Sequence, residues 1–156
     1  MMVEKGSSKA SERAKKAINT LRQRGKPPVI AGVTPDQLKI LKHAYSAASS
    51  AIGRAQKNNL RYDAQWLLDC QRQIVEQQFL CAATGLPFDL KAHKTKGAGG
   101  THFAPSPDRI DSEMGYVKEN VRWVLWAVNR AKGEMPNDLF IKICREVVKK
   151  ADEHHF

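Results

Sequence analysis

The stretch from Pro105 to Lys132 reads PSPDRIDSEMGYVKENVRWVLWAVNRAK, and it says more about the fold than any other part of the chain. The short apolar run from Val121 to Val124 predicts a strand, and a polar-tipped strand precedes it across a loop. A helix is predicted directly after the second strand. We therefore predict a β-β-α unit, although an ordinary hairpin followed by a surface helix fits the same pattern.

Helices are predicted on both sides of this unit. Thr34-Pro35-Asp36-Gln37 combines a hydroxyl cap, a proline at the first helical position and a glutamine suited to a capping box, so a helix is expected from there to about Lys57. A second helix is expected between its cap Asp63 and a point near Phe79. A third is expected over about 137–153. Its apolar stripe predicts a core-facing side made of Leu139, Phe140, Ile143, Val147, Val148 and Ala151.

The length of 156 residues suits one compact domain with a tail. The predicted fold class is α+β, a mostly helical single domain built around the β-β-α unit and covering 34–156. Residues 1–33 are predicted to form a basic, loosely ordered arm. Its first 28 residues hold eight basic and two acidic side chains, so they carry six of the ten net positive charges. A merely solubilising tail is the alternative for this segment.

The formal net charge of +10 predicts attraction to anionic polymers, of which polyphosphate backbones are the commonest. Ribosome-associated and anionic-lipid-binding proteins are equally basic, so the charge permits this partner without proving it. No run of 18 apolar residues and no apolar secretory core occurs. We therefore expect no membrane association and a cytoplasmic location.

The three cysteines are Cys70, Cys81 and Cys144, an odd number at wide spacing with no CxxC pair. This pattern predicts neither a disulfide framework nor a four-cysteine zinc site. Buried, reduced thiols are expected instead.

Four pieces of the quoted stretch resemble the HNH (His-Me finger) endonucleases, in the zinc-less variant common among phage and prophage proteins. In chain order they are Asp108-Arg109-Ile110-Asp111, Gly115-Tyr116, Asn120-Val121-Arg122 and Asn129-Arg130-Ala131-Lys132. The segments 54–57 and 81–88 also resemble the helix and turn that precede the motif in that family, so the resemblance spans about 50–148. It implies a β-β-α metal finger in a DNA endonuclease, located in the host cytoplasm if the chain is phage-encoded.

The resemblance implies a role for three polar residues. Asp108 and Asn129 match the two protein ligands of one divalent ion, and oxygen ligands suit Mg²⁺ or Mn²⁺. Asn120 matches the central asparagine, which pins the loop between the strands. The implied reaction is hydrolysis of phosphodiester bonds in duplex or branched DNA.

This chain departs from the family at Arg109, where the histidine that activates water is expected. Arginine keeps its proton near neutral pH, so it cannot be the general base, but it can clamp a phosphate oxygen. The candidates for a substitute base are Asp111, His102, His93 and a metal-bound water. Asp111 is the first choice, although an aspartate before Ser112 also commonly caps a turn. If the strand before Asp108 is fully extended, His102 lies about 20 Å from Asp108, which is too far for both to serve one metal site.

Lys132, Arg122 and Lys118 are predicted to form a basic track for the DNA backbone around Asp108. Alone, each is interpreted as a solvated charge, as are Arg54 and Lys57.

A structural zinc ion is not expected, because the family's two CxxC pairs correspond here to Cys81 with Thr84 and to Leu125 with Val128. Apolar packing is predicted to replace the metal, and it would involve Phe88, Leu125, Trp126 and Val128.

Two other functions compete with the endonuclease. A catalytically degenerate HNH fold would bind nucleic acid or act as a regulator. A basic RNA-binding accessory protein is less well supported, because the RNP and GXXG signatures are absent. The oligomeric state is left open.

Overall fold

The computed structural model describes residues 31–92 and 100–154, and the predicted arm therefore lies almost entirely outside the described residues, as does His93. Within them the chain forms a small α+β domain with four α-helices and a two-stranded antiparallel sheet. The elements in chain order are α2 (Pro35–Lys57), α3 (Ala64–Glu76), β1 (Pro105–Arg109), the 3-10 turn η1 (Lys118–Asn120), β2 (Val121–Leu125), α4 (Trp126–Lys132) and α5 (Asn137–His154).

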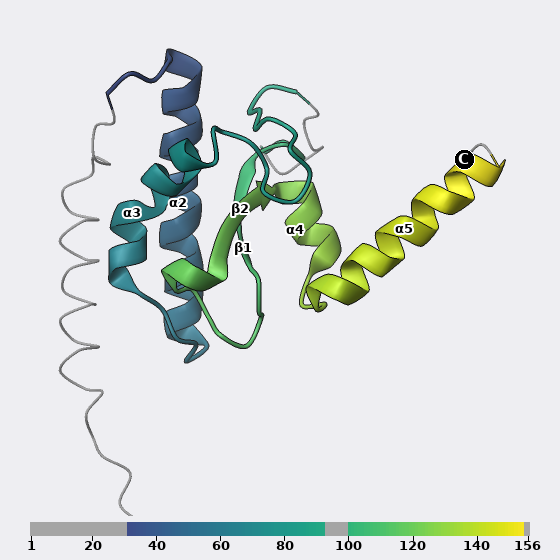
Figure 1. The fold of residues 1–156 in the computed structure, drawn as a ribbon. Coiled ribbons are helices and arrows are strands. Elements are labelled where there is room, and N and C mark those ends of the chain that lie inside the picture. Colours follow the sequence, from purple (N-terminus) through teal and green to yellow (C-terminus); the bar gives the residue numbers. More distant parts are fainter. Residues whose placement is uncertain (1–30, 93–99, 155–156) are drawn as a thin grey trace, which may run out of the picture.

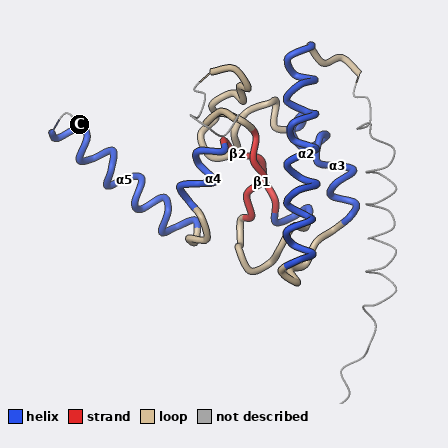
Figure 2. Tube along the Cα trace, turned by 180° about the vertical axis from the view of Figure 1, so that it is seen from behind, coloured by secondary structure: helices blue, strands red, loops and turns tan. Residues whose placement is uncertain are grey.

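The hairpin of β1 and β2 lies at the centre of the molecule, with helices on both faces (Figure 1). Seen from either side, α2 and α3 cover one face and α4 covers the other (Figures 1 and 2). The register pairs Asp108 with Arg122 and Pro107 with Trp123. Because neighbouring side chains of a strand point to opposite faces, Asp108 and Trp123 belong to different layers. The strand, strand and helix follow one another as predicted.

The hydrophobic core fills the layer between the hairpin and the two long helices. Trp123 of β2 is fully buried there, stacks on Trp66 of α3 at 6.2 Å between ring centroids, and donates its indole N–H to the Cys70 carbonyl at 3.0 Å. The side of α2 that faces the core includes Ala44, Ala48 and other alanines. Their small side chains let α2 pack closely on β1.

Caps and turns set the ends of the long helices. Thr34 Oγ1 accepts the Gln37 N–H at 3.2 Å and Gln37 Oε1 accepts the Thr34 N–H at 2.8 Å, so the predicted capping box is confirmed. α3 begins after Asp63, as predicted, but ends at Glu76 rather than near Phe79. The reason is local, since Gln78 and Phe79 have positive φ angles of 56° and 60°, which a right-handed helix does not accommodate.

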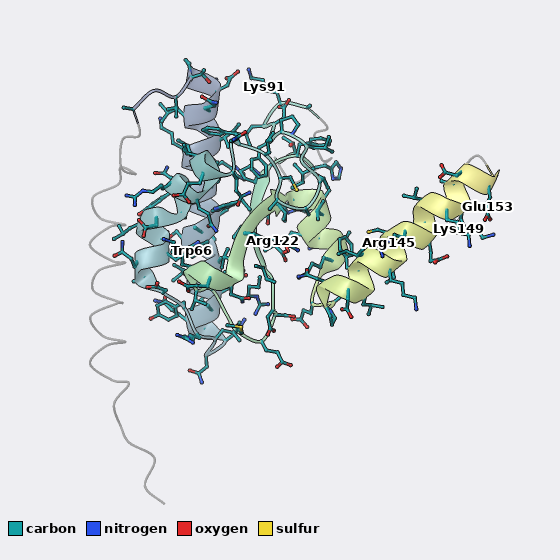
Figure 3. All side chains as sticks on the ribbon, viewed as in Figure 1. Trp66, Lys91, Arg122, Arg145, Lys149 and Glu153 are labelled. Atoms are coloured by element: carbon teal, nitrogen blue, oxygen red, sulfur yellow. The ribbon has the colours of Figure 1, made fainter. Side chains whose placement is uncertain are left out.

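The prediction that the stripe of α5 faces the core is wrong. α5 projects away from the body of the molecule (Figure 1), and its residues Leu139, Ile143, Val147 and Val148 are 42–59% exposed. Helical periodicity identifies an apolar face but does not say which surface covers it. Arg145, Lys149 and Glu153 mark the projecting helix in Figure 3, whereas Trp66 lies within the packed part.

The cysteines differ in their surroundings. Cys70 and Cys81 are buried, as predicted, but Cys144 is exposed on α5, so for this residue the prediction is wrong. Burial raises the pKa of the Cys70 thiol to about 12.

Among the described residues, no helix combines the length and the apolar character needed to cross a bilayer.

Candidate functional site

Asp108 lies at the centre of a buried ion-pair network between β1 and α4. Its side chain is only 2% exposed. Oδ1 accepts a hydrogen bond from Lys132 Nζ at 3.0 Å, and Oδ2 accepts one from Arg122 Nε at 2.9 Å. Lys132 is 1% exposed and also donates to the Arg109 carbonyl at 2.9 Å. Both carboxylate oxygens are therefore engaged by cations of the chain itself.

The predicted basic track is distributed over separate parts of the molecule. Lys132 is buried against Asp108, and Arg122 divides its guanidinium between Asp108 and Asn137 Oδ1, which it contacts at 2.8 Å. Lys118 is exposed on η1 and lines a shallow hollow with Trp66 and other residues of α3. The structure thus does not gather the three side chains into one surface.

Asn129 lies on the same side of β1 as Asp108. Its Nδ2 donates to Ser106 Oγ at 2.8 Å and to the Pro107 carbonyl at 3.0 Å. Ser106 and Asp108 alternate with Pro107 along the strand and share the face that α4 covers. The two implied metal ligands are therefore brought to one layer of the molecule.

Arg109 points to the opposite face of the hairpin. Its guanidinium lies 5.3 Å from the centroid of the Tyr116 ring, which stacks on Trp66, and it donates a hydrogen bond to the Ser112 carbonyl. One residue along a strand reverses the direction of the side chain. For this reason Arg109 is separated from Asp108 although the two are neighbours in sequence.

Asp111 and Asn120 hold the loop between the strands together. Asn120 is buried; its Oδ1 accepts the Asp111 N–H at 2.9 Å, and its Nδ2 donates to the carbonyls of Asp111 at 2.7 Å and Gly115 at 2.9 Å. This geometry agrees with the loop-pinning role that the resemblance implies for Asn120. Asp111 Oδ1 accepts the Glu113 N–H at 2.9 Å, which is the turn-capping alternative to the role of a base.

A polar cleft of about 560 Å³ lies beside this layer, where α2, β1 and α4 meet. In the part of the chain that the structure describes, Arg54 and Arg130 form no ion pair, so both cations are available to a ligand. The guanidinium of Arg130 lies 5.9 Å from the ring centroid of Trp126. The residues that line the cleft are Arg54, Ser106, Trp126, Asn129, Arg130 and Gly133.

His102 lies next to one wall of this cleft. Its ring centroid is 5.7 Å from that of Trp126, and its carbonyl accepts the Ala127 N–H at 3.0 Å. The chain turns just before β1, where the Ala104 N–H donates to the Thr101 carbonyl at 3.2 Å, so the extended path assumed for His102 is not present. Of the residues predicted to replace zinc, Phe88 and Leu125 are in the core and Val128 packs against it, but Trp126 lines the cleft.

The positions that correspond to the zinc ligands of the family form other contacts. Cys81 Sγ accepts the Leu125 N–H at 3.3 Å, which joins the 81–88 turn to the end of β2. Thr84 Oγ1 accepts the Leu86 N–H at 3.2 Å within that turn. Hydrogen bonds and packing hold the turn against the sheet.

Asp108 and Asn129 do not fit a divalent ion in the present arrangement. An ion that approached the Asp108 carboxylate would meet Lys132 and Arg122, which carry charge of the same sign and already use both oxygens.

The sequence-based interpretation missed Arg54 and Arg130 as site residues. Arg54 was interpreted as a solvated residue at the end of a helix, and it meets α4 only through the packing of α2 beside β1. Arg130 was named only as part of the motif. Its position next to Asn129 on one short helix was the available signal.

In comparisons with known proteins, no family model matches the chain, and neither a curated protein nor a solved structure matches it.

Proposed function

We propose that this protein binds nucleic acid through the cleft between α2, β1 and α4, with the sugar-phosphate backbone as the bound group. The observation that carries the proposal is the pair of arginines, Arg54 and Arg130, which face one cleft without an anionic partner among the described residues. Guanidinium groups form strong bidentate hydrogen bonds with phosphate oxygens. Here both lie beside Ser106 and Asn129, whose polar atoms extend the same surface.

The chemistry of the cleft suits a polymer better than a small anion. Trp126 offers an aromatic surface beside the two arginines, and such surfaces stack with bases where strands are open or branched. The net charge of +10 adds long-range attraction, most of it from the segment before α2. The partner in this proposal is duplex or branched DNA.

Binding is favoured over cleavage because of the state of Asp108. A buried carboxylate with cations on both oxygens stabilises the fold between β1 and α4, but it does not present a free ligand to a metal ion. Arg109, which stands where a catalytic histidine is expected, points to the other face of the hairpin. This proposal corresponds to the catalytically degenerate alternative for an HNH-like fold.

The test compares DNA binding by the wild type and by Arg54→Gln/Arg130→Gln in fluorescence anisotropy with short labelled duplex and branched DNA. Since a hydrogen bond to a charged group contributes about 1.5–3 kcal/mol, Kd is expected to rise about tenfold or more for each arginine. The matched control is Arg61→Gln/Arg72→Gln, which removes the same charge from exposed residues outside the cleft. Equal weakening by both pairs of substitutions would contradict a cleft-specific role.

Cleavage of phosphodiester bonds by a Mg²⁺- or Mn²⁺-dependent site is the second candidate. One observation favours it: Asn129 lines the cleft, and Asp108 lies on the same face of β1. It requires Lys132 and Arg122 to release Asp108 when DNA binds.

A plasmid-nicking assay with Mg²⁺, Mn²⁺ or EDTA distinguishes the two functions. Metal-dependent nicking that Asp108→Asn abolishes, with DNA affinity retained, would establish the endonuclease. The binding proposal expects intact plasmid under all three conditions, together with salt-sensitive binding.

A further inference from the structure

The apolar surface of α5 is wider than packing against a single neighbouring surface would cover. Residues three and four apart share a helix face, and on α5 the apolar residues cover more than half of the circumference. Most of them are exposed, and none is fully buried. Apolar patches of this extent mark interaction surfaces. The residues of this arc are Leu139, Phe140, Ile141, Ile143, Cys144, Val147, Val148 and Ala151.

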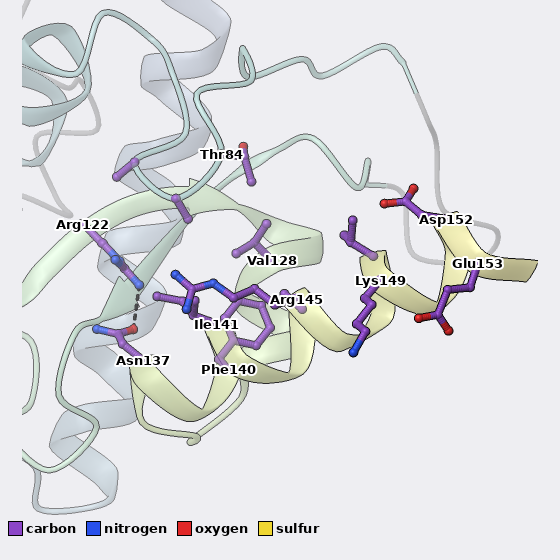
Figure 4. Close-up of a pocket in the computed structure, with 14 residues that line it drawn as sticks. Thr84, Arg122, Val128, Asn137, Phe140, Ile141, Arg145, Lys149, Asp152 and Glu153 are labelled. Carbon is purple, nitrogen blue, oxygen red and sulfur yellow. Dashed lines mark hydrogen bonds between the residues drawn. The ribbon is translucent and has the colours of Figure 1, made fainter. Parts of the chain in front are cut away.

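The direction of α5 is set at its base, so this surface does not belong to a loosely attached tail. Arg122 Nη2 donates to Asn137 Oδ1 at 2.8 Å, a contact drawn as a dashed line in Figure 4. Asn137 Nδ2 in turn approaches the Ile110 carbonyl at 3.4 Å, and Ser112 Oγ donates to the Glu134 carbonyl at 3.0 Å. These contacts fix the first turn of α5 and the connection before it against the hairpin.

A groove of about 940 Å³ separates α5 from the body of the molecule (Figure 4). Ala82, Ala83 and Val128 line it on the side of the body, and Ile141 and Val148 line it on the side of α5. Its walls are mainly apolar and run along the helix. A second helix inserted there would contact both walls.

We propose that each α5 lies in the groove of a second copy of this chain, so that the two α5 helices pack antiparallel about a two-fold axis near Cys144. The sequence of the apolar arc is suited to this symmetry, because a two-fold axis at residue 144 places Phe140 opposite Val148 and Ile141 opposite Val147. Each pair joins a large side chain to a smaller one.

This placement of each α5 in the groove of the other copy also accounts for the width of the apolar arc. The side of α5 with Phe140, Cys144 and Val148 faces the partner helix. The side with Leu139 and Ile143 faces the body of the partner, because each helix lies between its twin and the other copy's hairpin domain. A single neighbour would leave one of these sides exposed.

Charge favours a second copy over a strongly acidic or basic partner. α5 carries four basic and four acidic side chains, so it is neutral in a chain whose net charge is +10. Two such helices associate without net repulsion, and oppositely charged residues flank the apolar arc on both copies. The basic residues are Lys142, Arg145, Lys149 and Lys150, and the acidic residues are Asp138, Glu146, Asp152 and Glu153.

Sedimentation equilibrium of the full chain tests the association. The wild type is expected to be a dimer at micromolar concentration, and Ile141→Glu/Val148→Glu is expected to be a monomer with unchanged helix content by circular dichroism. The matched control is Lys42→Gln/Lys57→Gln, which changes the net charge by the same amount at exposed positions of α2, away from α5 and its groove, and is expected to remain dimeric. A monomeric wild type overturns the proposal, as does a dimer that the glutamate variant retains.

A short bis-maleimide tests the axis, because Cys144 is the exposed cysteine while Cys70 and Cys81 are buried. The wild-type dimer is expected to be crosslinked and Cys144→Ser is not. A dimer without this crosslink overturns the placement of the axis near Cys144.

Discussion

Lys132 and Asp108 form an ion pair that water does not reach, with Nζ and Oδ1 3.0 Å apart. Removing a charge from water is costly, and the cost is offset only when the partner and further hydrogen bonds are in place. Here Arg122 and the Arg109 carbonyl complete the set. At the scale of single residues, this network explains why polar side chains persist at the centre of the domain.

Replacing Lys132 with methionine tests the network. Loss of the ammonium leaves Asp108 buried with Arg122 alone, and breaking such a buried pair costs about 3–5 kcal/mol. Urea denaturation of Lys132→Met is therefore expected to give a free energy of unfolding lower by about 3 kcal/mol or more. The double variant Asp108→Asn/Lys132→Met is expected to recover part of that loss. Wild-type stability in Lys132→Met would show that the pair is not stabilising.

Gly115 is required by its backbone conformation and by a close neighbour. Its φ is +80°, and a Cβ atom built there would overlap the carbonyl oxygen of Arg61. That carbonyl also accepts the Tyr116 N–H at 2.9 Å, so it cannot move without breaking a contact between the loops.

Gly115→Ala is expected to lower the free energy of unfolding by more than the 1–3 kcal/mol or so of backbone strain alone. Gly85→Ala is the control, because Gly85 also has a positive φ, +70°, but no atom lies within 4 Å of its added Cβ. Thermal and urea unfolding of both variants provide the comparison. Equal losses in the two variants would mean that the contact with Arg61 has no cost.

At the scale of elements, α2 depends on its first turn. The middle of the helix is buried in the core, but the first turn is largely exposed and relies on Thr34 and Gln37 for its hydrogen bonds. Four backbone N–H groups at a helix start lack partners within the helix, and side chains supply them. The capping box therefore determines where α2 begins.

Thr34→Ala is expected to destabilise the protein by about 1 kcal/mol, the usual cost of losing such a cap. Ser46→Ala is the matched control, since Ser46 is an exposed residue in the interior of the same helix, where alanine is the better helix former. Chemical denaturation measures both. A loss in Ser46→Ala as large as that in Thr34→Ala would exclude a specific role of the cap.

At the scale of the whole molecule, the net charge and the exposed apolar surface lie in different parts of the chain. α5 is neutral and apolar on one side, whereas the net charge of +10 lies in the rest of the chain. The proposed DNA cleft and the proposed dimer surface therefore use different chemistry. A two-fold dimer would contain two clefts, one in each copy.

The salt dependence of DNA binding measures how many phosphates the chain neutralises. Each neutralised phosphate contributes about 0.9 to the slope of log K against log salt concentration for duplex DNA. Arg54→Gln/Arg130→Gln is expected to reduce the slope by about 1.8 relative to the wild type. Arg61→Gln/Arg72→Gln is expected to leave it unchanged. Identical slopes in the wild type and the cleft variant would show that these arginines do not contact phosphate.

Local patterns were sufficient to predict much of the fold. The cap at Thr34, the start of α3 after Asp63, the order of strand, strand and helix, and the extent of α5 all follow from hydrogen-bonding and periodicity over a few residues. The bonds that form these elements join neighbours in the sequence, so their signals are local. The end of α3 was missed because two positive φ angles terminate it.

The candidate site was predicted only in part. Asp108, Asn129 and Lys132 were recognised as important polar residues, and they do lie in one layer between β1 and α4. Their pairing was not foreseen, because a motif gives residue types while the partners of a carboxylate depend on which side chains the packing brings within 3 Å. Arg109 was misplaced because side-chain direction in a strand alternates with each residue.

The amino-acid sequence alone determined the charge of the chain, the places where helices and strands form and the existence of an apolar face on α5, because each depends on composition or on neighbouring residues. Tertiary structure alone decided that Asp108 is neutralised by Lys132 and Arg122, that Arg54 and Arg130 share a cleft, and that α5 projects from the domain. The physical reason is that burial and pairing are properties of surfaces brought together from distant segments. Such contacts exist only once the chain has folded.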